Sequence, residues 1–164
     1  MSIKNKIRGI RNKTQGDKTE NLLCDFFHFK RFDGCFNIVD EKNKVIFEVK
    51  SSRKYKNKVT FFIKSANHKL GCKIYESFHS IIINVSALED SIKYAKNFGY
   101  SFKFIFCFFE SDFFEVFFVE SEKIIELIDY PKREKISVSR AWVLKNANMV
   151  NHKLNLIGNS QIFL

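Results

Sequence analysis

Three residues of this chain have the types and the spacing to do chemistry on a phosphodiester bond. Asp33 is followed fifteen residues later by Glu48, and Lys50 stands two positions beyond Glu48. Two carboxylates can hold one or two Mg²⁺ ions, because Mg²⁺ prefers oxygen ligands. A lysine beside the metal can orient or deprotonate the attacking water, or it can stabilise charge on the phosphate. The combination predicts a site for metal-assisted hydrolysis.

The residues around this combination have the pattern of a β-hairpin. We expect two strands, at 32–39 and 45–50, joined by a polar turn. Because side chains alternate between the two faces of a strand, Glu48 and Lys50 share one face, and the apolar residues beside them point toward the core. The turn brings the two ends of the hairpin, and with them the two carboxylates, toward each other. The carbonyl of Val49, between the two polar side chains, is a further candidate metal ligand.

The spacing and placement of these residues resemble the PD-(D/E)xK nuclease superfamily, which includes type II restriction endonucleases, archaeal Holliday junction resolvases and some repair and homing nucleases. The core of that superfamily is a helix, a strand meander, a second helix and a further strand. The resemblance covers about residues 14–85. It implies that Asp33 and Glu48 bind metal and that Lys50 assists the water. The chain departs from the family name in one place, with Phe32 where the name has Pro.

Two further segments resemble the junction resolvases of this superfamily. The opening of the first expected helix, Gln15 to Glu20, has their small-polar-then-acid pattern, and the strand end from Glu48 to Ser52 is similar to theirs. Members often add an acid from the first helix to the metal site or its surroundings. The resemblance therefore makes Glu20 a fourth candidate catalytic residue.

The chain is strongly basic, with 28 Lys and Arg residues against 18 Asp and Glu residues and a formal net charge of +10. Basic proteins attract polyanions, and nucleic acid is the commonest polyanion inside cells. The basic residues gather in runs at 4–13, 53–58 and 132–135. The plainer interpretation of these runs is solvated segments without a partner. The residues that we expect to contact DNA are Lys13, Ser51, Arg53, Lys54, Lys56, Lys58, His68 and Lys69.

The pattern of strands and helices predicts one α/β (α+β) domain over residues 1–164. The resemblance adds a restriction-endonuclease-like core, in which helices flank a central mixed β-sheet. Residues 1–13 are expected to form a basic arm, for which disorder is one option, and about 130–164 a C-terminal extension for recognition or dimerisation. The expected helices cover 15–27, 65–77, 87–98 and 123–128. The further expected strands cover 59–64, 80–85, 102–109, 113–119 and 136–144.

Several classes of protein are disfavoured by features that the sequence lacks. The N-terminus is basic and polar rather than a signal peptide, and no apolar run approaches the roughly 20 residues that a membrane helix needs. The four cysteines form no CxxC pair, so we expect reduced thiols rather than structural zinc. The six glycines are scattered, which disfavours a phosphate-binding loop. These features predict a cytoplasmic protein.

The leading hypothesis is a Mg²⁺-dependent endonuclease, with Mn²⁺ as a substitute metal, that cuts double-stranded or branched DNA. Restriction-type and resolvase-type substrates both stay open, and both classes usually cut as homodimers. One alternative is a non-catalytic nucleic-acid-binding module with a nuclease-like fold, and another is a protein-interaction domain whose charge is incidental. The plainest alternative makes Glu48 and Lys50 an ordinary surface ion pair, worth about 0.2–1 kcal/mol.

Overall fold

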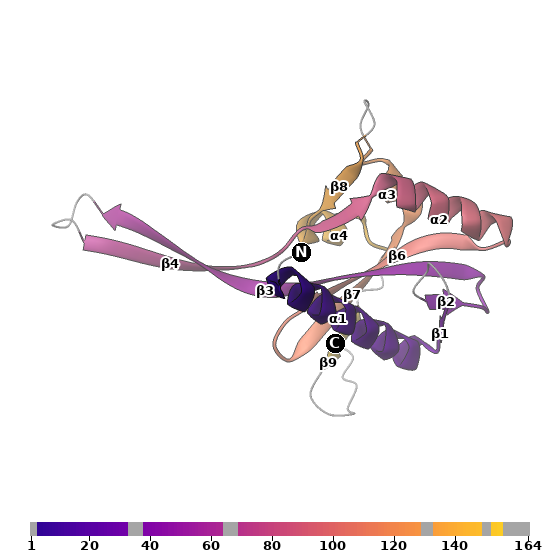
Figure 1. Ribbon diagram of the computed structural model, residues 1–164, viewed down its shortest axis with the longest axis horizontal. Coiled ribbons are helices and arrows are strands. Elements are labelled where there is room, and N and C mark those ends of the chain that lie inside the picture. Colours follow the sequence, from indigo (N-terminus) through magenta and orange to yellow (C-terminus); the bar gives the residue numbers. More distant parts are fainter. Residues whose placement is uncertain (1–2, 33–37, 64–68, 129–132, 149–151, 156–164) are drawn as a thin grey trace.

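The computed structural model describes residues 3–32, 38–63, 69–128, 133–148 and 152–155, and these form a mixed α/β fold, as predicted (Figure 1). None of the helices in these ranges is both long enough and apolar enough to cross a bilayer. The helices are α1 (Ile3–Phe27), α2 (Val85–Asn97), α3 (Ser121–Ile125) and α4 (Arg140–Asn146). The strands are β1 (Lys30–Arg31), β2 (Ile38–Asp40), β3 (Val45–Ile63), β4 (Lys69–Phe78), β5 (Ile81–Asn84), β6 (Ser101–Phe109), β7 (Phe113–Glu120), β8 (Lys135–Val138) and β9 (His152–Asn155).

The main sheet is mixed and curls into a half-barrel. Its strands lie in the order β1-β2-β3-β6-β7-β9, and β4 pairs with the outer part of β3. β3 and β6 run parallel, from Val45↔Ser101 to Arg53↔Phe109, whereas the other neighbouring strands are antiparallel. A parallel pair requires a long crossover connection, and α2 lies in this one. β5 and β8 form a separate two-stranded sheet.

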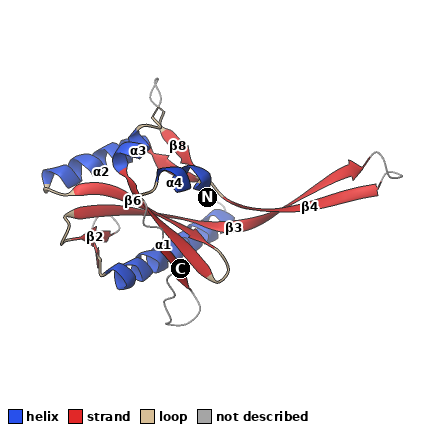
Figure 2. Ribbon diagram, turned by 180° about the vertical axis from the view of Figure 1, so that it is seen from behind, coloured by secondary structure: helices blue, strands red, loops and turns tan. Residues whose placement is uncertain are grey.

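Two apolar layers cover the two faces of the main sheet. On one face, Leu23 of α1 packs in a cluster with Val45 and Phe47 of β3. On the other face, Ile46 packs with phenylalanines of β6, with α2 and with the small sheet. Figure 2 shows α1 on one side of the main sheet and α2, α3 and α4 on the other. The alternation that was expected along 45–50 is therefore confirmed.

The central elements form where the sequence predicts them. The aromatic segments at 102–109 and 113–119 form the expected hairpin, β6 and β7. Every residue from Phe104 to Phe108 is fully buried, because β6 lies between β3 and β7 and is covered on both faces. The helix expected at 87–98 forms as α2. It is followed by Gly99, whose φ of 74° suits the left-handed conformation that ends many helices.

The segment at 65–77 differs from the expected helix. From Lys69 onward it forms β4, which pairs with β3 over its whole length. Ile, Tyr and Phe, which stand at positions 74, 75 and 78, favour strands. The continuous pairing with β3 also gives the backbone N–H and C=O groups the hydrogen-bond partners that a helix would supply internally. The separate strand that was expected at 59–64 is the outer end of β3. The predicted helix is therefore wrong.

The two ends of the chain also differ from expectation. α1 begins at Ile3, so most of the segment that was expected to be a basic arm is helical. β8 ends at Val138, although the expected strand continued to residue 144. The hydroxyl of Ser139 accepts a hydrogen bond from the backbone N–H of Trp142 at 3.2 Å, and this cap starts α4 instead. The short helix that was expected at 123–128 forms as α3.

β3 is longer than the sheet around it. It pairs with β6 as far as Arg53, and from there outward its ladder partner is β4. The paired segments Lys54–Ile63 and Lys69–Phe78 form the β3–β4 arm. Figure 1 shows the arm leaving the body of the molecule as a two-stranded ribbon. One strand thus belongs both to the buried sheet and to an exposed extension.

Candidate functional site

Glu48 and Lys50 lie in the inner part of β3. Across the parallel ladder, their register partners are Phe104 and Phe106 of β6. On the other edge of β3, β2 pairs with residues 45–47. The polar pair therefore begins where the described β2 ladder ends, between the apolar body and the arm.

The two side chains contact each other. Nζ of Lys50 forms an ion pair with Oε1 of Glu48. Residues two positions apart on a strand point to the same face, as was expected for this pair. The side chain of Glu48 is 22% exposed and that of Lys50 is 31% exposed. A small molecule or a phosphate can therefore reach the pair, although protein surrounds most of it.

The first residue of the predicted site, Asp33, lies outside the described residues. The described chain resumes at Ile38, whose register partner is Phe47, the residue before Glu48. Val49 packs its side chain against the cluster on the α1 face, and the role of its carbonyl as a metal ligand stays a prediction. Among the described residues, no three His, Cys, Asp or Glu side chains gather in a way that could hold a metal ion.

Glu20 has surroundings of its own, away from Glu48. It lies on α1, which packs on the face of β3 opposite the Glu48 side chain. Its side chain is 10% exposed, and its carboxylate forms an ion pair with Arg31 at 2.8 Å. Burial raises the pKa of Glu20, although the Arg31 guanidinium opposes the rise, and the Asp17 carboxylate adds to it. The structure therefore joins Glu20 to Arg31 and does not bring it to the Glu48–Lys50 pair.

The residues that were expected to contact DNA have different surroundings. Arg53 donates a hydrogen bond from Nη2 to Oε1 of Gln15, which keeps its guanidinium beside α1. Ser51 is half-buried. His68 lies outside the described residues, and so does the side chain of Lys69. The exposed members of the group are Lys13, Arg53, Lys54, Lys56 and Lys58.

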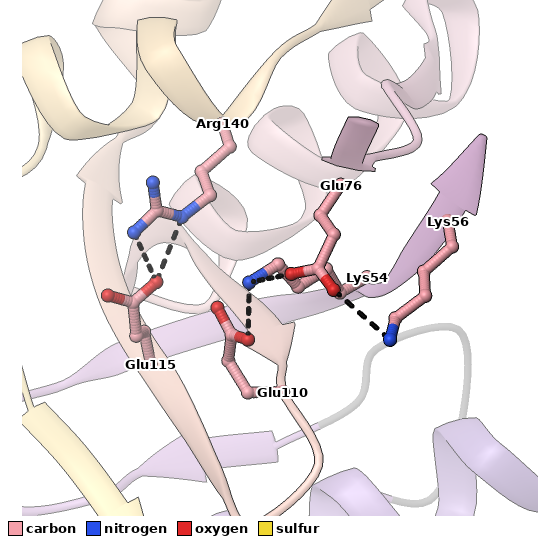
Figure 3. A network of polar contacts seen from close by, with 6 residues as sticks. All are labelled: Lys54, Lys56, Glu76, Glu110, Glu115 and Arg140. Carbon is pink, nitrogen blue, oxygen red and sulfur yellow. Dashed lines mark hydrogen bonds and ion pairs between the residues drawn. The ribbon is translucent and has the colours of Figure 1, made fainter. Parts of the chain in front are cut away.

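Lys54 is held between two carboxylates at the base of the arm (Figure 3). Its Nζ lies 2.9 Å from Oε2 of Glu76 on β4 and 2.8 Å from Oε2 of Glu110, which follows β6. Glu76 also forms an ion pair with Lys56 at 3.4 Å. The hydrogen bond to Glu110, and next that to Glu76, raises the pKa of Lys54, while the bond from Lys54 lowers the pKa of Glu76. Lys54 and Glu76 therefore stay charged near neutral pH, and the network ties the arm to the body.

The network borders two hollows on the surface. The first, of about 480 Å³, lies between the base of the arm and the β6–β7 turn. The second, of about 430 Å³, lies toward α4. Beside it, Arg140 donates two hydrogen bonds to Oε2 of Glu115, at 2.9 and 2.6 Å (Figure 3). Its guanidinium lies 5.4 Å from the centre of the Phe78 ring. The ion pairs of Lys54 and the contact of Arg140 with Phe78 thus hold the base of the arm against the body. The first hollow is lined by Arg53, Lys54, Tyr55, Lys56, Glu76, Phe109, Glu110 and Ser111.

Sequence reasoning did not single out Glu76 or Glu110. Glu76 falls in the segment that was expected to be helical, and Glu110 is 56 positions away from Lys54. Only the pairing of β3 with β4 makes Glu76 the cross-strand neighbour of Lys56. Opposite charges on cross-strand neighbours attract each other. With the strand register known, this rule would have pointed to the contact between Lys56 and Glu76.

No protein-family model matches the chain, and no curated protein or solved structure matches it either. The function is therefore inferred from the side chains of β3 and their surroundings. These offer a carboxylate and an amine in contact on an accessible face, and exposed lysines farther along the same strand.

Proposed function

We propose that this protein is a metal-dependent endonuclease of the PD-(D/E)xK type that acts on double-stranded or branched DNA. The observation that carries the proposal is the Glu48–Lys50 ion pair on one face of β3. In this proposal Glu48 is a metal ligand, and Lys50 orients the attacking water or stabilises charge on the phosphate. Lysine suits both roles, because its ammonium is a compact charge with three donors on a flexible stem.

The order and direction of the elements around β3 support the proposal. The chain runs from α1 through the β2–β3 hairpin, and later through α2 into β6, which is parallel to β3. The core of the superfamily that the sequence resembles has a similar order, with a helix, a strand meander, a second helix and a further strand. We therefore propose a restriction-endonuclease-like core, to which the β3–β4 arm and the elements after β6 are added.

A divalent cation is part of the proposal, and the described residues supply part of its donor set. Mg²⁺ takes carboxylate and carbonyl oxygens, and Mn²⁺ would be accepted by the same donors. Glu48 and the Val49 carbonyl are the donors on β3, and Asp33 is the proposed second carboxylate. When bound, such an ion polarises the phosphate and lowers the pKa of a bound water. Lys50 adds a positive charge on the same face.

One observation favours a second candidate, a nucleic-acid-binding module without catalysis. Lys50 is engaged by Glu48, and within the described residues no third acidic group joins them. The exposed lysines farther along β3 would then contact phosphates. Binding of this kind is sensitive to salt and does not need a divalent metal.

Cleavage of defined DNA substrates separates the two candidates. The protein is incubated with supercoiled plasmid, linear duplex and a four-way junction, each in Mg²⁺, in Mn²⁺ and in EDTA. We expect cleavage in either metal and none in EDTA. Asp33→Asn should lower the rate at least about 100-fold, as expected for the loss of a group in the reacting site. Asp90→Asn, which removes an exposed carboxylate on α2, is the matched control.

The outcomes differ between the candidates. If wild type binds DNA in a salt-sensitive way but cuts no substrate in either metal, the nuclease is rejected and the binding module is supported. Cleavage that persists in EDTA also rejects the metal-dependent reaction. If cleavage occurs, a preference for the four-way junction over linear duplex identifies a resolvase-type substrate.

A further inference from the structure

The β3–β4 arm is a strongly basic part of the chain. Its two segments of ten paired residues carry five basic residues and one acidic residue, a formal net charge of +4. The whole chain of 164 residues has a net charge of +10, so the arm is far more positive for its size than the rest. The basic residues are Lys54, Lys56, Lys58, Lys69 and Lys73, and the acidic residue is Glu76.

Alternate positions of β3 connect the arm to the candidate site. Lys54, Lys56 and Lys58 are two positions apart and therefore share a face of the strand. The same alternation includes Ser52, which is buried, and then Lys50, so this face of the strand leads from the ion pair with Glu48 onto the arm. The side chain of Lys56 is 75% exposed, and Lys58 is exposed as well. A polyanion that lies along the arm would therefore reach the Glu48–Lys50 pair.

The dimensions of the arm fit the major groove of duplex DNA. Ten ladder pairs, from Lys54↔Phe78 to Ile63↔Lys69, join its strands. At about 3.3 Å per residue they span roughly 30 Å, close to the 34 Å of one DNA turn. A two-stranded ribbon fits a major groove of about 12 Å, whereas a minor groove of about 6 Å admits one only where the DNA is deformed. The major groove of duplex RNA is deep and narrow, so RNA should be a poor partner.

The arm also exposes large apolar side chains that a bound partner would cover. Ile74 is 62% exposed and Tyr75 is 47% exposed, and an isolated two-stranded ribbon is only marginally stable in water. Ile74 is the cross-strand neighbour of Lys58, so an apolar and a cationic side chain stand together on one face. Base edges and phosphates offer both kinds of contact within a groove. A second copy would cover the apolar groups too, but its arm would carry the same positive charge and repel this one.

We propose that the β3–β4 arm lies in the major groove of duplex DNA, with Lys56 and Lys58 on backbone phosphates and Ile74 against base edges. Lys54 stays with Glu76 and Glu110 and holds the base of the arm in place. The inference rests on the proposed function only in naming DNA as the polyanion, because binding by the arm needs neither metal nor cleavage.

Affinity for a short labelled duplex, measured by fluorescence anisotropy in EDTA, tests the inference. The double variant Lys56→Ala with Lys58→Ala is compared with Lys42→Ala with Lys93→Ala, which removes two exposed lysines outside the arm. We expect the arm variant to lose at least about tenfold in affinity. Its slope of log affinity against log salt should become shallower by about 1.8, because each lost phosphate contact removes about 0.9. The control should stay near wild type. Methyl green, which occupies the major groove, should displace the protein, whereas netropsin, which occupies the minor groove, should not.

Three results would overturn the inference. The first is an arm variant with wild-type affinity and salt slope. The second is displacement by netropsin but not by methyl green. The third is an arm variant that changes the molar mass in light scattering but not the DNA affinity, which would make a second copy the occupant. Binding in EDTA and cleavage in Mg²⁺ are separate measurements, so cleavage without arm-dependent binding rejects only the arm. Arm-dependent binding without cleavage rejects only the nuclease.

Discussion

The polar side chains of β3 differ in their neighbours, and this difference decides what each residue can do. Lys50 contacts one carboxylate, Glu48, on a face that is partly open to solvent. Lys54 lies between Glu76 and Glu110, both within 3 Å of its Nζ. A cation shared by two carboxylates has little net charge left for a phosphate. Lys54 is therefore an anchor of the arm, and Lys50, with its one carboxylate partner, is the lysine for which we propose a catalytic role.

The pKa of Glu20 allows a test of burial at the scale of one residue. Desolvation raises this pKa even though Arg31 lies 2.8 Å away. A raised pKa means that ionisation of Glu20 costs more in the folded than in the unfolded chain. The stability that this raised pKa contributes to the folded state is present in full below the ordinary value of 4.5, and it is lost as the pH rises through the pKa of Glu20 in the folded chain. Wild type should therefore lose stability relative to Glu20→Gln as the pH rises across this window.

The measurement is the free energy of unfolding in urea, taken for both proteins from about pH 4 to pH 7. Asp25→Asn, which removes an exposed carboxylate from the same helix, is the control. It should show no comparable divergence from wild type. A relative gain in stability by wild type with rising pH would contradict the prediction, because the attraction of Arg31 would then outweigh burial.

Single residues were predictable where a local rule places them. Period-two alternation places Glu48 and Lys50 on one face, and the ion pair follows from it. The neighbours of Glu20 and Lys54 depend on segments that the fold brings together, Arg31 after a turn and Glu110 from a distant hairpin. No spacing in the sequence encodes such contacts. Asp33 stays a prediction, since it lies outside the described residues.

Elements with a clear period and a buried partner formed where they were expected. The amphipathic helix α2 and the apolar β6–β7 hairpin are examples. The pattern of apolar residues within each segment is enough to place α2 over the core and the hairpin inside it. β4 was not predicted, because its strand conformation depends on pairing with β3. From Cys72 to Phe78, where the side chains of β4 are described, polar and apolar residues are mostly exposed and none is buried, so no buried face sets a period there. The arm could therefore not be recognised before the register was known.

Hydrogen exchange tests the arm as an element. β6 has a ladder partner on each side and is fully buried in its centre, whereas β4 has β3 alone and its described side chains are mostly exposed. We expect the amides of β4 to exchange at least about 100-fold faster than those of β6 in the free protein, because local opening is much cheaper there. Duplex DNA should slow the amides of β4. Mass spectrometry measures the exchange. Equal protection of the two strands in the free protein would contradict an exposed arm.

The whole molecule is organised around a sheet with an apolar layer on each face. Phe106 belongs to the layer on the α2 face and is fully buried, while its neighbour Ile105 belongs to the layer on the α1 face. The sequence predicts the mixed α/β class from its alternating strands and helices. The curl of the main sheet and the small β5–β8 sheet depend on pairings between distant segments, and they appear only in the structure.

Phe106→Ala tests this central role of β6. Loss of a fully buried ring should lower the free energy of unfolding by about 3–5 kcal/mol, from lost apolar transfer and the cavity left behind. Phe98→Ala is the control, since Phe98 is 63% exposed and should cost no more than about 0.5 kcal/mol. Urea denaturation measures both. Similar losses in the two variants would contradict the central position of β6.

The positive charge of the molecule is unevenly distributed. Of the net charge of +10, +4 lies on an arm that continues the strand of Glu48 and Lys50. A long-range attraction toward DNA would therefore lead it to the place where cutting is proposed. Two strands need two cuts, so a homodimer on DNA remains our prediction.

The proposed endonuclease activity depends most on the Glu48–Lys50 pair, and single-turnover cleavage of one DNA substrate with excess protein tests it most directly. Rates in Mg²⁺ are compared for wild type, Glu48→Gln and Lys50→Met, and DNA affinity is measured in EDTA for the same proteins. Glu41→Gln is the matched control, because Glu41 forms an exposed ion pair with Lys30 at 2.6 Å. We predict that both site variants lose at least about 100-fold in rate but keep their DNA affinity, and that the control keeps both. Site variants that cut as fast as wild type would contradict the proposed catalytic role of the pair and make it an ordinary surface contact.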